Sequence, residues 1–129
     1  MLAAICDDDN TDRILVGKIL QEKMKNRREP LTIEYFECGE DLVEKYESGK
    51  QKYDLLILDI YMKYMDGMDA AKRIRRYDRN AAIIFLTTTP DYAVESYEVR
   101  ATDYLLKPVS EGRMGEALNH FLEEHYPKV

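Results

Sequence analysis

Four short stretches of the sequence carry side chains that could do chemistry together. Three consecutive aspartates occupy 7–9, directly after the apolar run that opens the chain, and Asp59 ends the aliphatic stretch LLILD. Three threonines occupy 87–89, and Lys107 precedes a proline. Carboxylates can bind a divalent cation, while a hydroxyl and an ammonium group can bind phosphoryl oxygens. The chemistry depends on whether the fold brings these stretches to one place.

Apolar spacing along the chain alternates between the pattern of a strand and that of a helix. Apolar runs predict five strands, at 2–6, 31–36, 55–59, 81–87 and 102–107. Each is followed by helical spacing or by a helix start signal, at 11–25, 42–46, 70–77, 90–99 and 110–124. Strict alternation predicts an α/β fold, a doubly wound five-stranded parallel sheet with five helices. The strand order 2-1-3-4-5, which is flavodoxin-like, is the natural expectation.

In an open parallel sheet the binding crevice lies at the carboxyl ends of the strands. The acids 7–9, Asp59, the threonines 87–89 and Lys107 end the first, third, fourth and fifth strands, so they would converge. Each has an ordinary explanation when taken alone, because acids cap helices and a lysine suits any surface. Coincidence at four strand ends is a poor explanation, and a shared pocket is the better one.

Clustered carboxylates raise one another's pKa unless a cation neutralises them. Mg²⁺ is the expected cation, because it takes one or two protein carboxylates and completes its shell with waters and a phosphate oxygen. Asp8 and Asp59 suit direct ligation, with Asp7 holding a metal-bound water. A carboxylate so placed can attack a phosphoryl group and form an aspartyl phosphate. Lys107 would then neutralise negative charge on the phosphoryl oxygens, and Thr87 would donate a hydrogen bond to one of them.

These residues resemble the receiver domain of bacterial two-component response regulators over essentially the whole chain. The matching motifs are AICDDDN, LLILDIYMKYMDGMDAAKRIR, IIFLTTTPDYA and ATDYLLKP. The resemblance implies a receiver domain over 1–129 that accepts a phosphoryl group from a sensor histidine kinase, with Mg²⁺ or Mn²⁺ as cofactor. It implies Asp59 as the phosphoacceptor. It also implies the metal ligands, which are Asp7, Asp8, Asp59 and the backbone carbonyl of Tyr61.

The same resemblance implies which groups respond to the phosphoryl group. Thr87 is the hydroxyl that reorients toward it, Lys107 is its ion-pair partner, and Tyr104 is the aromatic rotamer switch. Pro108 is the expected cis proline. The fourth and fifth strands and the helices after them would change shape together as a two-state switch.

Two positions of this family line the path of the hydrolytic water, and here they are Tyr61 and Thr89. The bulk of Tyr61 predicts slow autodephosphorylation. Lys63 stands where the family usually has proline, so the loop after the third strand is expected to be looser or to place a charge near the site. None of these departures removes a charged group that the chemistry requires.

The stretch DYAVESYEVRATDYLLKPV is closest to receivers of LytTR-type transcriptional regulators. We expect a DNA-binding output domain beyond residue 129, a homodimer on phosphorylation, and DNA contact through that domain alone, since a net charge of -6 opposes phosphate binding by this segment. A stand-alone receiver that acts through protein contacts is the alternative. The opening MLAAIC lacks a signal-peptide pattern and no apolar run is long enough to span a bilayer, which predicts a cytoplasmic protein without membrane contact.

Two other kinds of protein use part of this set of groups. A phosphatase of the haloacid-dehalogenase type also forms an aspartyl phosphate, but it needs a second aspartate two residues later, where this chain has Tyr61. A degenerate receiver that binds partners without phosphorylation would not need the complete set of acids, hydroxyl and lysine. The chain is therefore expected to carry out only its own phosphorylation and dephosphorylation, and not to be an enzyme with a separate substrate.

Overall fold

Five parallel strands form one sheet in the order β2-β1-β3-β4-β5. Their bounds are β1 Leu2–Cys6, β2 Thr32–Phe36, β3 Leu55–Leu58, β4 Ala82–Thr87 and β5 Asp103–Leu106. The coordinates are those of a computed structural model, which describes residues 1–126. Both the α/β class and the predicted strand order are confirmed.

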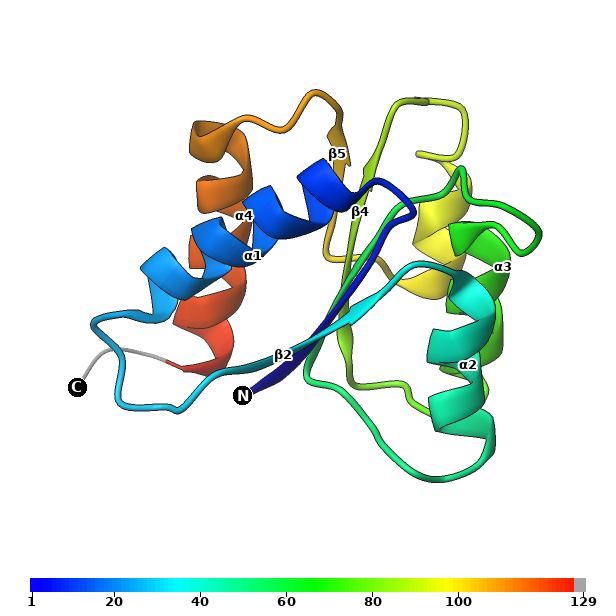
Figure 1. Ribbon diagram of the computed structural model, residues 1–129, viewed down its shortest axis with the longest axis horizontal. Coiled ribbons are helices and arrows are strands. Elements are labelled where there is room, and N and C mark those ends of the chain that lie inside the picture. The colour runs from blue at the N-terminus through cyan, green and yellow to red at the C-terminus, as the bar shows by residue number, and fades with distance from the viewer. Residues whose placement is uncertain (127–129) are drawn as a thin grey trace.

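Helices cover both faces of the sheet (Figure 1). Helices α1 (Asn10–Met24) and α4 (Glu111–His125) pack on one face, while α2 (Gly39–Glu47), α3 (Gly67–Arg75) and the short helix η1 (Glu95–Val99) lie on the other. Side chains of successive strand residues point to opposite faces, so Ile57 joins the core under α1 and α4 whereas Leu58 joins the core under α2 and α3. Two apolar cores thus hold the sheet rigid between them.

The central strands are buried along their whole length, as their continuous apolar runs predict. Every residue of β3 and β4 is buried, whereas β2 has exposed and half-buried positions, as expected of an edge strand. A strand packed on both faces cannot shift its register without moving side chains between the two cores. The carboxyl ends of β3 and β4 are therefore fixed positions from which a functional side chain can project.

The helix predicted after β4 is the one element that differs from the expectation of five α-helices. Residues 1–126 contain four α-helices, and the segment after β4 forms turns followed by the 3₁₀ helix η1. Within η1 the buried residues are Ser96 and Val99, three positions apart, while Tyr97 is 82% exposed. A spacing of three residues matches one turn of a 3₁₀ helix. A longer α-helix in this segment would have too little apolar surface to bury against the sheet.

No helix within residues 1–126 combines the length and the apolar character needed to cross a membrane.

Candidate functional site

The register of β1 and β3 places Asp7 and Asp59 at the same level. Cys6 is paired with Leu58, and the acids are the next residue on each strand. The backbone N–H of Asp59 donates to the Cys6 carbonyl over 2.9 Å, and the N–H of Asp7 donates to Phe36 O over 3.0 Å. These bonds continue the sheet by one residue and fix the direction of both carboxylates.

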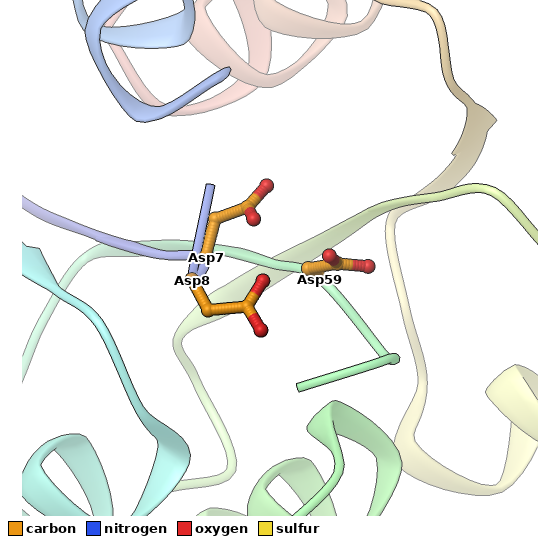
Figure 2. Close-up of side chains that lie close together, drawn as sticks. All are labelled: Asp7, Asp8 and Asp59. Carbon is orange, nitrogen blue, oxygen red and sulfur yellow. The ribbon is translucent and has the colours of Figure 1, made fainter. Parts of the chain in front are cut away.

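Three carboxylates meet at this edge of the sheet. Asp7, Asp8 and Asp59 each place one oxygen so that all three oxygens lie within 4.8 Å of one another (Figure 2). Asp7 and Asp59 are buried, whereas Asp8 is exposed at the rim of the cluster. The convergence of the first and third strand ends, predicted from their sequences, is what the structure shows.

Lys107 brings a positive charge from the end of β5 into this cluster. Its ammonium nitrogen lies 2.8 Å from Asp7 Oδ2 and 3.1 Å from Asp59 Oδ2. It also lies 2.8 Å from Asp12 Oδ2, on the first turn of α1. Burial alone would lower the pKa of Lys107, but the hydrogen bonds to Asp12 and Asp7 outweigh burial and raise it. The lysine is therefore charged at neutral pH.

The contact with Lys107 does not offset the effect of burial on the pKa of Asp7. Burial raises the pKa of Asp7 from 3.8 to about 6, although hydrogen bonds from Lys107 and from the backbone N–H of Asp9 act in the opposite direction. The neighbouring charge of Asp59 raises the pKa of Asp7 further. A site in which a carboxylate binds its proton this tightly favours an additional cation.

Two buried oxygens at the site, Asp59 Oδ1 and Thr87 Oγ1, have no hydrogen-bond partner among residues 1–126. Buried polar atoms are normally paired in folded proteins, so each of these marks a place where a ligand can bind. A free carboxylate oxygen beside two further carboxylates suits a hard cation that prefers oxygen ligands. The donor set therefore fits Mg²⁺, and the free hydroxyl is available to an anion.

Tyr104 and Tyr61, two further residues predicted at the site, both contact the segment that follows β4. The Tyr104 hydroxyl donates to the Thr89 carbonyl, and its ring packs on Phe85 with the ring centroids 6.0 Å apart. Tyr61 is half exposed and meets the ring of Tyr92 edge-on at 6.2 Å. These contacts link the loop after β3 with the segment after β4.

Thr87, Thr89 and Pro108 lie at or just beyond the ends of β4 and β5. Thr87 is fully buried at the end of β4, where its carbonyl accepts from the Lys107 N–H over 2.7 Å. The Lys107–Pro108 peptide bond is cis, as expected. Thr89 is buried, and its hydroxyl accepts from the Asp91 N–H over 3.0 Å, which ties it to the turn that follows β4.

Sequence reasoning missed two residues that shape the site from α1. Asp12 contacts Lys107, and Arg13, which is 7% exposed, donates to the Asp7 carbonyl over 2.5 Å and to Asn10 Oδ1 over 2.9 Å. The run DDDNTD shows a helix start, and Asp9 does cap α1 by accepting from the Asp12 N–H over 2.9 Å. A capping pattern does not say which side of the first turn faces the sheet, so the run gave no signal for these contacts.

Gly67 was also missed, although it lies against the end of β3. A Cβ atom at this position would stand 1.9 Å from the backbone carbonyl oxygen of Asp59. The Gly67 N–H donates to the Ile60 carbonyl over 2.8 Å, so α3 begins in direct backbone contact with the chain that carries Asp59. The close approach requires a residue without a side chain.

Fold and site together define a flavodoxin-like α/β protein with a cluster of three aspartates and a lysine at the carboxyl edge of its sheet. The model of the response regulator receiver domain matches residues 3–119, and the chain belongs to that family.

Known proteins of this family resemble the chain over much of its length. The sensory transduction protein LytT of Bacillus anthracis is 30% identical over 118 residues, which are 92% of this chain and 47% of LytT. Other matches are named sensory transduction protein LytT and transcriptional regulatory protein LytR. The chain spans about half or less of the length of these curated relatives.

Solved structures show the same fold. The response regulatory domain of protein mrkE from Klebsiella pneumoniae superposes with a TM-score of 0.82 at 25% identity, covering 96% of this chain and 97% of that domain. The response regulator protein TrrA from Thermotoga maritima, solved in complex with Mg²⁺-BeF, gives a TM-score of 0.77 at 30% identity. This match covers 94% of the chain and 98% of TrrA.

Proposed function

We propose that the chain is a phosphorylation-activated signalling switch whose phosphoacceptor is Asp59. The observation that carries the proposal is the setting of this carboxylate. Asp59 is 6% exposed, its Oδ2 lies 3.1 Å from the Lys107 ammonium, its Oδ1 is unpartnered within residues 1–126, and two more carboxylates lie beside it. The phosphodonor would be a phosphohistidine of a sensor histidine kinase.

In the proposed reaction an oxygen of Asp59 attacks the phosphorus of the donor. A new P–O bond forms while the P–N bond to the histidine breaks, and the ring nitrogen keeps the electron pair and then takes a proton. Lys107 lies where its ammonium can contact a transferring oxygen, because it already touches Asp59. The buried surroundings exclude bulk water and strengthen this interaction.

The residues that would hold Mg²⁺ or Mn²⁺ are Asp7, Asp8, Asp59 and the backbone carbonyl of Tyr61. When bound, the cation would supply neutralisation of charge on the phosphoryl oxygens. The unpaired Asp59 Oδ1, the raised pKa of Asp7 and the complex of TrrA with Mg²⁺-BeF all support this assignment.

A phosphoryl group on Asp59 would offer an acceptor to the free hydroxyl of Thr87. Movement of Thr87 would pull on the chain that leads to Thr89, whose carbonyl accepts from Tyr104. Tyr104 would then report the state of the site to the surface formed by η1 and β5. The switch is thus a local change in hydrogen bonding that biases two packings of this face.

The proposed output is control of transcription through a LytTR-type DNA-binding domain beyond residue 129. The names LytT and LytR among the relatives, and their greater length, support this proposal. The domain described here, acidic overall, would contribute phosphorylation in the cytoplasm and a homodimer contact, and would have no substrate other than its own phosphoryl group.

Incubation with acetyl phosphate and Mg²⁺, followed by intact-mass measurement, tests the phosphoacceptor. We expect a single added phosphoryl group that is released by hydroxylamine and is absent in Asp59→Asn. Asp54→Asn is the matched control, since Asp54 is an exposed acid before the other end of β3. Continuous release of phosphate from many donor molecules per protein would favour a phosphatase, and lack of any label would favour a binding module that works without phosphorylation.

A further inference from the structure

The ammonium group of Lys107 is shared by three carboxylates, and one of them has no part in the proposed phosphoryl transfer. Asp12 Oδ2 lies 2.8 Å from the Lys107 nitrogen, as near as Asp7 and nearer than Asp59 at 3.1 Å. Asp12 is therefore a principal partner of the lysine.

The contact between Asp12 and Lys107 differs from a mobile ion pair at the surface. The two side chains are 23% and 10% exposed. The backbone N–H of Asp12 donates to Asp9 Oδ1, and the next residue, Arg13, donates from its buried guanidinium to the Asp7 carbonyl. These bonds tie the first turn of α1 to the end of β1, which directly precedes it (Figure 1). Asp12 is thus held in contact with Lys107.

Three carboxylates lie within ion-pair distance of the Lys107 ammonium, and the one on Asp59 accepts a hydrogen bond from it. An ammonium group has only three N–H donors. A phosphoryl oxygen can therefore accept a hydrogen bond from Lys107 once one of the carboxylates has moved away. Asp7 is a proposed metal ligand and Asp59 carries the phosphoryl group. Loss of the contact between Asp12 and Lys107 would leave the proposed phosphoryl transfer intact. The negative charge of Asp12 also repels an anionic phosphodonor.

We propose that Asp12 is a positioning residue that restrains Lys107 in the unphosphorylated protein and thereby slows phosphorylation of Asp59. The inference rests on the proposed role of Asp59 and adds a regulator of that same site. The first turn of α1, through Asp12, thus determines how readily Lys107 exchanges a carboxylate contact for a contact with a phosphoryl oxygen.

The test compares phosphorylation rates of the full chain with acetyl phosphate at saturating Mg²⁺. In this reaction a P–O bond forms to Asp59, the P–O bond to the acetyl group breaks, and acetate leaves with the electron pair. Asp12→Asn should raise the rate at saturating donor roughly three- to tenfold, the factor expected for release of one partly buried charged contact. Asp12→Glu, which keeps the charge within reach of the lysine, should restore a rate close to that of the wild type.

Asp9→Asn is the matched control for loss of one negative charge at the same helix end. Its side chain bonds the Asp12 backbone, a role that asparagine also fills, while the ammonium of Lys107 has its three contacts elsewhere. The control should change the rate by less than about twofold, since an exposed charge is largely screened. Circular dichroism verifies folding, and Asp12→Ser, another residue favoured at a helix start, serves as a second variant.

The outcomes separate the inference from the function on which it rests. A wild-type chain without label on Asp59 contradicts the proposed function and overturns the inference with it. A labelled wild type with Asp12→Asn and Asp12→Ser at or below its rate overturns the inference alone. Equal acceleration in Asp9→Asn also overturns it, because the effect would then be one of overall charge.

Discussion

The ammonium nitrogen of Lys107 lies 2.8 Å from Oδ2 of Asp7, and the two side chains are 10% and 6% exposed. Even with this contact, burial raises the pKa of Asp7 to about 6. Three carboxylates contact this single ammonium group, so the cluster carries excess negative charge. This excess negative charge attracts a cation, and it lowers the stability of the protein when no cation is bound.

We expect Asp7→Asn to stabilise the metal-free protein at neutral pH. The pKa of Asp7 in the folded state lies above its ordinary value of 3.8. The stability that Asp7 contributes is therefore fully present below pH 3.8 and is lost as the pH rises through about 6. The free energy of unfolding of the variant should exceed that of the wild type by about 1–2 kcal/mol at pH 7 and equal it near pH 4. Urea unfolding in a chelator measures both values, and equal stability at pH 7 would show that Lys107 compensates Asp7 fully.

Cation binding should depend on pH through the same carboxylate. Asp7 must lose its proton to act as a ligand, so the apparent dissociation constant for Mg²⁺ should rise as the pH falls below about 6. The increase approaches about tenfold per pH unit for a single proton. Calorimetric titration between pH 5 and 8 measures it. A dissociation constant that does not change over this range would assign the ligand role to the other acids.

Gly67→Ala should lower stability strongly because the added methyl group meets backbone. Its Cβ would lie 1.9 Å from the Asp59 carbonyl oxygen, so α3 or the end of β3 must move. We expect a loss of about 3 kcal/mol or more in the free energy of unfolding, together with slower phosphorylation of Asp59.

Gly112→Ala is the matched control for this substitution. Gly112 lies in the first turn of α4, and a Cβ there would meet Ser110 Oγ at an ordinary 3.7 Å. Alanine favours a helix over glycine, so this variant should be neutral or more stable by up to about 1 kcal/mol. Similar losses in both variants would show that the close approach at Gly67 is not what makes that position sensitive.

The sequence allowed the sheet and the convergence of the acids to be predicted because each rests on a strong local pattern. Continuous apolar runs identify central strands, and the residue that follows such a run must lie at the edge of the sheet. Asp7, Asp59 and Lys107 could be placed together on this basis. The strand register, which was not predicted, is fixed by the two cores.

The residues that escaped prediction depend on geometry that no local pattern carries. Asp12 contacts Lys107 across the interface of α1 and β5, and this contact depends on how far α1 rotates about its own axis. In the sequence Gly67 is an ordinary glycine at a helix start, and only the structure shows its close approach to the Asp59 backbone. The turns after β4 were predicted as helix because Pro90 is a common helix start, but the segment buries too little apolar surface to sustain one.

The lifetime of the phosphoryl group is expected to depend on Tyr61. Its ring is half exposed and meets Tyr92 edge-on, and we expect the pair to restrict the approach of water to a phosphoryl group on Asp59. Tyr61→Asn should shorten the half-life of the aspartyl phosphate roughly three- to tenfold, because it opens this path and offers an amide to orient a water. Loss of label after removal of the phosphodonor measures the half-life. Tyr64→Asn, in the same loop but 86% exposed, should leave it unchanged. If the half-life is the same in both variants, the water path does not run past Tyr61, and the hydroxyl of Thr89 becomes the group to replace.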